Sequence, residues 1–231
     1  MSTLMNDSGR LLECQTSWKQ GIYSISFPNQ KIRKLDENSP DTKTMVYPIC
    51  NPDNEIKSMG VYFPTTVSPR KHYDDQLSCD IISNKGKHGA HTARLATGMF
   101  FFMKFLYPKF LLSDYIVPIP AQNSNIITGP ISIVNYLTEY LKNNSTYKIS
   151  FLSPLEKRFS QKMKFMYRQA RREFYEKNPD AFTVKNNVVL KGKTILLVDD
   201  VLTSGSTMRF CKNKLEEAGA IVNAITAAMT A

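Results

Sequence analysis

Cysteine is scarce in this sequence, and its four cysteines form no motif. Cys14, Cys50, Cys79 and Cys211 are widely spaced and include no CxxC pair. This spacing excludes a zinc ribbon and gives no sign of a disulfide framework. The first ten residues also lack the basic and then apolar layout of a signal peptide. We therefore expect a protein of a reduced, cytoplasmic setting.

The sequence also lacks an apolar run long enough to cross a membrane. Its most apolar stretch, residues 95–112, is interrupted by Lys104, Pro108 and Lys109. It falls short of the roughly 20 apolar residues that a span requires, so we predict a buried helix and no membrane contact. The sequence has no repeat or low-complexity tract, and its 42% hydrophobic and 22% charged residues are typical of a globular protein.

Acidic side chains are few relative to basic ones. The chain has 20 Asp and Glu against 30 Lys and Arg, a formal charge of +10. Residues 156–177 contribute half of this excess, with eight basic and three acidic side chains. Such an excess attracts phosphate groups, either on a nucleic acid or on a small anionic substrate.

Two regions of different texture follow one another along the chain. Residues 1–85 are rich in Pro, Asn, Asp and Ser, with short β-like runs at 21–27, 43–49 and 59–63. Turn residues separate these runs, which predicts a small β-rich N-terminal region. Residues 86–231 have a more regular pattern and are expected to form the core domain.

Within 86–231, apolar strands alternate with helical patterns. Strands are predicted at 114–120, 147–152, 193–199 and 221–229, and helices at 89–107, 128–142 and 207–218. The pattern predicts an α/β fold with a parallel β-sheet flanked by helices. In such folds ligands bind beyond the carboxyl ends of the strands.

The most informative segment is ILLVDDVLTSGST, residues 195–207. An apolar strand ends in two carboxylates, Asp199 and Asp200, and a loop of small hydroxyl residues then opens into a helix. Gly205 lets the backbone approach a phosphate closely, and the helix N-terminus adds converging N–H groups and a positive end. A hydroxyl-rich helix N-cap beside a solvated strand end is the alternative.

This segment resembles the signature of the type I phosphoribosyltransferases, which bind 5-phosphoribosyl 1-pyrophosphate (PRPP). The resemblance implies that Asp199 and Asp200 contact the ribose hydroxyls and, directly or indirectly, Mg²⁺. It also implies that the loop grips the 5′-phosphate of PRPP through Thr203, Ser204, Gly205, Ser206 and Thr207. Family members that act on 6-oxopurines often have an acidic base where Thr203 stands, which disfavours hypoxanthine or guanine as the acceptor.

The family has a second loop, which binds pyrophosphate after the first core strand. That place corresponds to AQNSN, residues 121–125, so the resemblance implies pyrophosphate contacts by Ala121, Gln122 and Asn123. Short polar residues can present backbone N–H groups to an anion. A plain turn between strand and helix is the alternative.

The basic segment 156–177 also carries an apolar stripe of helical period. The stripe predicts an amphipathic helix, and its members are Phe159, Met163, Met166, Ala170 and Phe174. Type I phosphoribosyltransferases place their flexible catalytic loop here, so the resemblance makes Lys157 and Arg158 the candidate catalytic residues on pyrophosphate. A solvated basic face is the alternative.

The wider sequence resembles the ComF-like (competence-protein) branch of that family. The resemblance lies in the order Arg158, Gln161, Arg171 or Arg172, Asn178 and Ala181-Phe182, and more loosely in DIISNKGKH at residues 80–88. His88 and His91 stand one helical turn apart, as metal ligands sometimes do. We prefer the interpretation that these are two exposed histidines at the start of a helix and not metal ligands.

Two functions follow as expectations. The first is a phosphoribosyltransferase that uses PRPP and Mg²⁺, transfers the phosphoribosyl group to a nitrogen nucleophile such as a nucleobase, and releases pyrophosphate. Residues 1–85 would then form the hood that selects the acceptor, and a homodimer is a further expectation. The second is a non-catalytic PRPP sensor or nucleic-acid-binding protein, which the charge of +10 favours.

Overall fold

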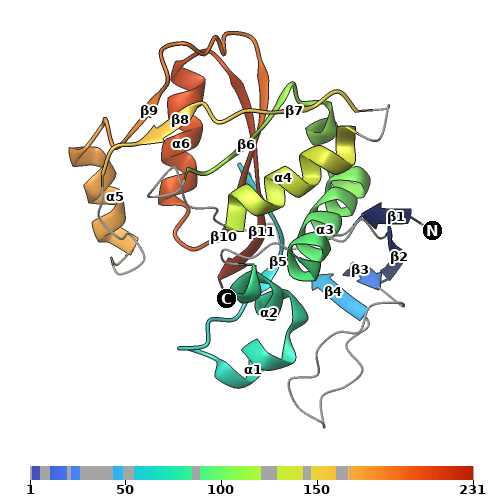
Figure 1. Ribbon diagram of the computed structural model, residues 1–231. Helices are drawn as coiled ribbons and strands as arrows, with labels where there is room; N and C mark the ends of the chain where they lie inside the picture. The colour runs from blue at the N-terminus through green and yellow to red at the C-terminus, as the bar shows by residue number, and fades with distance from the viewer. Residues whose placement is uncertain are drawn as a thin grey trace.

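A five-stranded parallel sheet forms the centre of the computed structural model (Figure 1). Every neighbouring pair of its strands runs parallel. In spatial order the strands are β5 (Ile56–Tyr62), β11 (Ile221–Thr230), β10 (Thr194–Leu202), β6 (Tyr115–Pro118) and β7 (Ser150–Phe151).

The structure describes residues 2–5, 11–19, 22–26, 44–48, 55–84, 89–120, 129–142, 147–159, 166 and 168–230. In the first four segments and at residue 168 it describes the backbone alone.

The central strand β10 is buried on both faces of the sheet. Its alternating side chains enter two separate cores: Leu196 and Val198 lie in one, and Ile195 and Leu197 lie in the other. All four are fully buried. Because side chains of a strand point to opposite faces with period two, this continuous apolar run requires helices on both sides.

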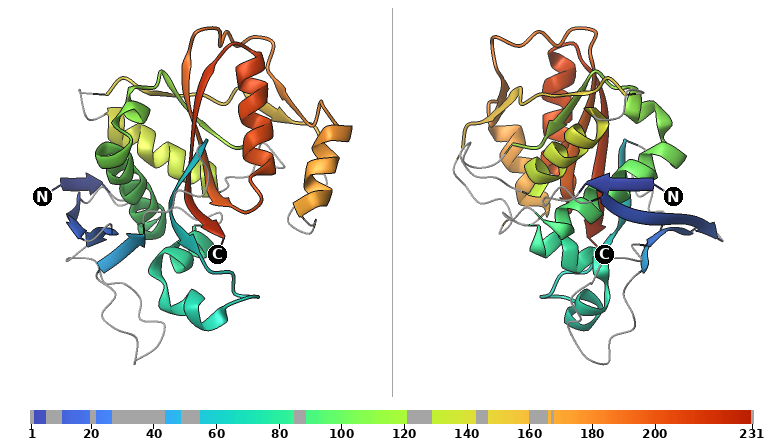
Figure 2. Two further views of the ribbon diagram at one scale, coloured as in Figure 1. Left: turned by 180° about the vertical axis from the view of Figure 1, so that it is seen from behind. Right: turned by 45° about the vertical axis from the view of Figure 1, so that its right-hand side comes forward.

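Helices α2 (Gln76–Ser83), α3 (Ala90–Leu106) and α4 (Gly129–Lys142) cover one face of the sheet (Figure 2). A short 3₁₀ helix, η1 (Pro108–Leu112), follows α3. The three consecutive phenylalanines Phe100, Phe101 and Phe102 of α3 are almost completely buried in this core. No described helix is long and apolar enough to cross a membrane.

The opposite face is covered by α6 (Ser206–Glu217) and by a two-stranded ribbon of β8 (Leu155–Lys157) and β9 (Phe182–Val184). Helix α5 (Arg168–Lys177) packs beside α6. Between these elements lies a cluster of aromatic rings, contributed by Phe159, Phe174, Tyr175, Phe182 and Phe210.

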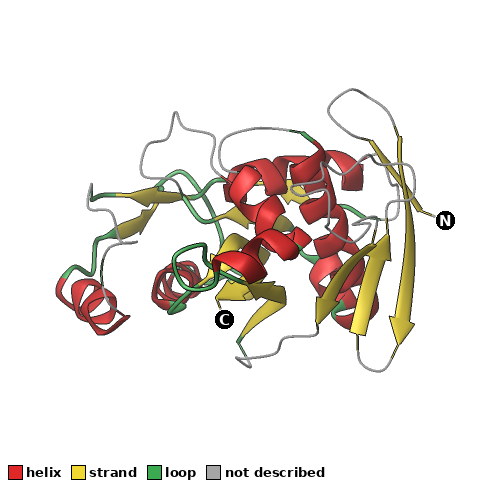
Figure 3. Cartoon of the chain, turned by 90° about the horizontal axis from the view of Figure 1, so that it is seen from below, coloured by secondary structure: helices red, strands yellow, loops and turns green. Residues whose placement is uncertain are grey.

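The first half of the N-terminal region forms a separate antiparallel sheet (Figure 3). Its strands are β1 (Ser2–Met5), β2 (Leu11–Lys19), β3 (Ile22–Ser26) and β4 (Thr44–Pro48), hydrogen-bonded in that order. Strand β5 and helix α1 (Pro69–Asp74) follow. The expected division at residue 85 stays a prediction, but β5 lies on its N-terminal side and is an edge strand of the parallel sheet.

The predicted fold class, α/β with a parallel sheet flanked by helices, is confirmed. One local prediction was wrong. A helix was expected over 156–177, but Leu155–Lys157 forms strand β8, and the described helix, α5, spans Arg168–Lys177. The apolar side chain of Leu155 is buried under the sheet and Phe159 packs on Phe174 and Phe182, so these residues serve a ribbon and an aromatic cluster. Residues 160–165 and 167 lie outside the described part of the chain.

Candidate functional site

The central strand β10 extends past the end of its neighbour β6. It pairs with β6 only from Ile195 to Val198, but with β11 as far as Leu202. Asp199 and Asp200 stand directly after the point where β6 ends. Both are half-buried, at the carboxyl edge of the sheet, which is the ligand-binding edge of parallel α/β folds.

The two carboxylates are held by the backbone that follows them. Asp199 Oδ1 accepts a hydrogen bond from the backbone N–H of Asp200 at 2.9 Å, and Asp200 Oδ1 accepts one from that of Val201 at 2.7 Å. Burial, and then the charge of Asp200, raise the pKa of the Asp199 carboxyl well above its usual range. A cation or hydroxyl donors placed beside the pair would relieve this repulsion.

The hydroxyl loop after β10 turns directly into α6. Gly205 adopts the left-handed conformation with φ of 74°, which a residue with a Cβ adopts only with strain. A Cβ there would lie 2.6 Å from Arg209 Nη1, which itself donates to the Ser204 carbonyl at 3.0 Å. The loop lines a hollow together with Asp199 and the first turn of α6. The positive end of α6 and the N–H groups of its first turn favour an anion in this hollow.

Helix α5 contacts both ends of this loop, which the sequence did not indicate. Arg171 Nη1 donates to Thr203 Oγ1 at 2.7 Å, and the Tyr175 hydroxyl lies 2.9 Å from Thr207 Oγ1. Each partner is 32 residues away along the chain. Burial raises the pKa of Tyr175 to about 12, so its phenol stays neutral at physiological pH and can donate a hydrogen bond to Thr207 Oγ1.

The start of α4 closes the opposite side of the carboxylate pair. A Cβ at Gly129 would lie 2.9 Å from Asp200 Oδ2 and 3.2 Å from Asn84 Nδ2. Asn84, fully buried at the end of α2, donates to the Gly129 carbonyl at 3.2 Å. In turn the Thr92 hydroxyl donates to Asn84 Oδ1. The glycine thus allows the backbone of α4 to approach Asp200.

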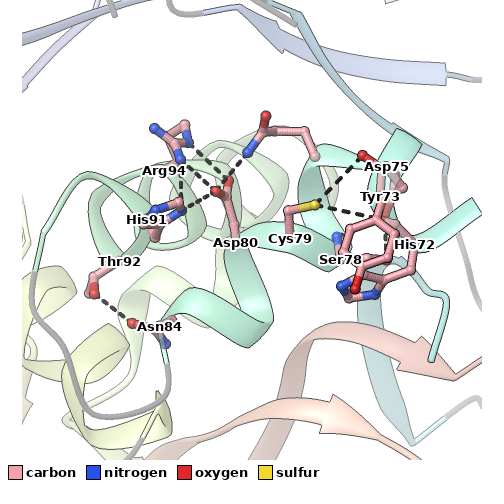
Figure 4. A network of polar contacts seen from close by, with 11 residues as sticks. His72, Tyr73, Asp75, Ser78, Cys79, Asp80, Asn84, His91, Thr92 and Arg94 are labelled. Atoms are coloured by element: carbon pink, nitrogen blue, oxygen red, sulfur yellow. Dashed lines mark hydrogen bonds and ion pairs between the residues drawn. The ribbon is translucent and has the colours of Figure 1, made fainter. Parts of the chain in front are cut away.

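A buried ion pair between Asp80 of α2 and Arg94 of α3 joins these two helices (Figure 4). Asp80 has no exposed surface, and its carboxylate accepts from Arg94 Nε at 2.9 Å and from Gln76 Nε2 at 2.8 Å. His91 Nδ1 lies 2.6 Å from Asp80 Oδ1. This pairing accounts for Asp80 in the DIISNKGKH segment, where only the resemblance had drawn attention to it.

A metal site at the histidines gains no support from the described residues. They contain no group of three or more His, Cys, Asp or Glu side chains that could hold a metal ion. His91 instead faces Asp80, with its side chain 40% exposed. His88, and the expected pyrophosphate contacts of Ala121, Gln122 and Asn123, lie outside the described residues.

The two candidate catalytic residues lie on the β8–β9 ribbon. Lys157 is half-buried, with its ammonium nitrogen 4.2 Å from the centre of the Phe159 ring. Burial lowers the pKa of Lys157, although the neighbouring Cys211 of α6 opposes this. Arg158 is exposed, and its backbone N–H is bonded to the Ala181 carbonyl at 2.9 Å. Their catalytic role stays a prediction.

Comparisons with known proteins find similarity to solved structures only. No family model matches it, and no curated protein matches it either. Among solved structures, one described as the allosteric regulatory enzyme of purine biosynthesis is 16% identical, with a TM-score of 0.38. The match covers 96% of this chain and 41% of that one, so the chain spans less than half the length of that protein.

Proposed function

We propose that this chain is a phosphoribosyltransferase that binds PRPP at the carboxyl edge of β10. One observation carries the proposal: two adjacent carboxylates and a left-handed glycine loop that opens a helix lie at the end of the same strand. The carboxylates are Asp199 and Asp200, and the glycine is Gly205. A phosphate suits the loop and the helix N-terminus, while ribose hydroxyls suit the carboxylates. PRPP carries both groups on one ring.

The carboxylate pair also fits Mg²⁺ that arrives with the substrate. Magnesium is commonly held by one or two carboxylates together with substrate phosphates, and keeps several waters. Asp199 and Asp200 are two such carboxylates, and their mutual repulsion favours a cation. When bound, Mg²⁺ would neutralise charge on the pyrophosphate group.

In the proposed reaction a nitrogen lone pair attacks C1 of PRPP. The bond from C1 to the pyrophosphate oxygen breaks, pyrophosphate leaves with the bonding electrons, and the nitrogen then loses its proton. Asp199 and Asp200 would hold the ribose as positive charge develops on its ring. Preorganised donors at the departing pyrophosphate lower the barrier, and Lys157 and Arg158 are the candidates for that part.

Within the type I phosphoribosyltransferases we place the chain beside the ComF-like branch. The reason is the order Arg158, Gln161, Arg171 or Arg172, Asn178 and Ala181-Phe182. The antiparallel N-terminal sheet would be the element that selects the acceptor, a nucleobase.

A non-catalytic PRPP sensor or nucleic-acid-binding protein is the second candidate. Exposed basic side chains on α5 favour it, since the Arg172 side chain is 80% exposed. Arg171, in contrast, donates to Thr203 in the hydroxyl loop of residues 203–207, which is the proposed phosphate loop. This favours a small phosphate ligand over a nucleic-acid backbone for that side chain.

Calorimetric titration with PRPP and Mg²⁺ tests the binding site. Wild-type protein should bind, and a folded Asp199→Asn/Asp200→Asn variant should lose charge-assisted hydrogen bonds worth roughly 1.5–3 kcal/mol each. Unchanged PRPP affinity in that variant would rule out the site. Pyrophosphate release with a panel of nucleobases then tests turnover, and binding without release for any base would favour the sensor.

A further inference from the structure

Arg171 is fixed at the mouth of the phosphate loop. The side chain is half-buried, with Nε donating to the Met166 carbonyl at 3.0 Å and Nη1 donating to Thr203 Oγ1 at 2.7 Å. These two bonds orient the plane of the guanidinium. Its remaining nitrogen, Nη2, carries two further N–H donors.

Tyr175 fixes the helix that carries this arginine. It lies one turn after Arg171, only 5% exposed, with its ring stacked on Phe210 at 4.7 Å between ring centres. Its hydroxyl reaches Thr207 Oγ1 at 2.9 Å. One face of α5 therefore spans the loop from its first residue, Thr203, to its last. A surface arginine that only interacts with solvent would not be anchored in this way.

The loop supplies polar hydrogen-bond donors but no positive side chain of its own, because residues 203–207 are Thr, Ser, Gly, Ser and Thr. Arg209 lies beneath Gly205 and donates to the Ser204 carbonyl. A phosphate monoester carries a charge of about −1.5 to −2 at pH 7. The guanidinium of Arg171, bonded to the first loop hydroxyl, is placed to oppose that charge.

We propose that Arg171 is a direct ligand of the phosphate monoester bound by this loop. The inference rests on the proposed function and deepens it: Arg171 grips the 5′-phosphate of PRPP and not its pyrophosphate. A guanidinium suits this role because it can keep its bonds to the Met166 carbonyl and the Thr203 hydroxyl while Nη2 still donates to phosphate oxygens. The phosphate oxygens would accept from Nη2 of Arg171 and from the Thr203 hydroxyl, whose own oxygen accepts from Nη1.

The next residue offers a matched control. Arg172 has the same charge and lies on the same helix, but its side chain is 80% exposed and its Nε pairs with Glu176 at 3.0 Å. Replacing either arginine with glutamine removes one positive charge from α5. Only Arg171→Gln removes a donor from the loop.

Calorimetric titrations with three ligands locate the phosphate that Arg171 contacts. The ligands are ribose 5-phosphate, magnesium pyrophosphate and PRPP with Mg²⁺. Arg171→Gln should weaken ribose 5-phosphate and PRPP at least tenfold and change pyrophosphate affinity less than twofold. Arg172→Gln should change all three less than twofold. Arg171→Lys should recover part of the affinity, since it restores the charge but not the fork.

Each other outcome has a definite meaning. Weaker pyrophosphate binding with unchanged ribose 5-phosphate affinity in Arg171→Gln overturns the inference and moves Arg171 to the pyrophosphate side. Equal losses of affinity in Arg171→Gln and Arg172→Gln also overturn it, because net charge alone would explain them. Wild-type affinity for ribose 5-phosphate in Arg171→Gln overturns the inference but leaves the PRPP site intact. Wild-type protein that binds none of the three ligands overturns the proposed function and this inference together.

Discussion

The Asp200 carboxylate lies against the backbone of Gly129, so closely that a Cβ at Gly129 would be 2.9 Å from Oδ2. Gly129 is the first residue of α4. The positive end of that helix therefore lies beside a negative side chain, which is a favourable arrangement. It also means that the position of Asp200 depends on a residue 71 places earlier in the sequence.

Replacing Gly129 with alanine should displace the Asp200 carboxylate. We expect PRPP affinity to fall about tenfold, because the side chain must turn away from the position in which it faces the ligand. Titration of Gly129→Ala with PRPP and Mg²⁺ measures this effect. A double-mutant cycle with Asp200→Asn is the control. If the glycine acts through Asp200, the double variant binds no more weakly than Asp200→Asn alone, whereas additive effects would contradict this route.

Asp199→Asn should make the protein more stable while it weakens PRPP binding. The pKa of Asp199 is raised in the folded protein, so folding disfavours its charged form. This cost is full above the folded pKa and disappears as the pH falls through the folded pKa towards the ordinary value near 4. Asparagine does not titrate. The gain in the free energy of unfolding should therefore be largest at about pH 8 and vanish on acidification.

Urea unfolding of both proteins between about pH 4 and pH 8 measures this dependence. Asp180→Asn, at an exposed turn position, controls for the removal of one negative charge from the whole molecule. A pH-independent difference between wild type and Asp199→Asn would mean that folding does not disfavour the charged form of Asp199, either by burial or by the charge of Asp200.

The sheet and the turn of residues 203–207 into α6 could be predicted from the sequence because both depend on local patterns. The continuous apolar run of 195–198 requires cover on both faces, and the two cores confirm this. Strand β10 nevertheless continues to Leu202, through both carboxylates. The reason is tertiary: its neighbour β11 continues to pair with it as far as Met229, which the sequence of β10 alone cannot indicate.

The contacts of α5 with the loop of residues 203–207 could not be predicted, because they join segments that are distant in the sequence. A helix was predicted over 156–177, yet Glu156 and Lys157 pair with β9 as part of a strand. Arg171 and Tyr175 looked like ordinary members of a basic amphipathic helix. Their bonds to Thr203 and Thr207 follow from the docking of α5 on α6, for which a single sequence provides no signal.

Gly205→Ala should lower stability and abolish PRPP binding, whereas Gly192→Ala should lower stability alone. Both glycines have φ of 74°, so either substitution introduces left-handed strain of about 1 kcal/mol. A Cβ at Gly192 meets nothing within 4 Å, while one at Gly205 would push Arg209 away from the Ser204 carbonyl. Urea unfolding and PRPP titration of both variants separate strain from damage to the site. Equal PRPP affinity in the two variants would place the phosphate elsewhere.

Tyr175→Phe should weaken PRPP binding by about threefold to tenfold, because the Thr207 hydroxyl loses its partner, a bond worth about 0.5–1.5 kcal/mol. The ring remains, so the stacking on Phe210 is retained. Titration with ribose 5-phosphate and with magnesium pyrophosphate measures the effect on each half of the ligand. The weakening should appear for ribose 5-phosphate only. A decrease confined to stability, with ligand affinity unchanged, would show that the hydroxyl serves packing alone.

Replacing Arg158 distinguishes an enzyme from a binding protein. Lys157 is half-buried over the Phe159 ring, so replacing it would disturb packing as well as charge. Arg158 is exposed, and its backbone N–H bond to Ala181 does not involve the side chain, so it is retained in Arg158→Ala. Arg158→Ala therefore tests the charge without changing the ribbon.

If Arg158 acts on pyrophosphate as the bond breaks, its interactions favour the transition state over bound PRPP. Arg158→Ala should then lower kcat about 100-fold, equivalent to about 2.7 kcal/mol, while the Kd for PRPP changes less than about threefold. Arg172→Ala on the exposed face of α5 is the matched control and should keep wild-type turnover. If the basic surface instead binds nucleic acid, Arg158→Ala should flatten the salt dependence of DNA affinity by about 0.7–0.9 log units for each phosphate that is no longer neutralised. Wild-type turnover in Arg158→Ala would refute the catalytic role, since an arginine that stabilises departing pyrophosphate cannot be removed without slowing its departure.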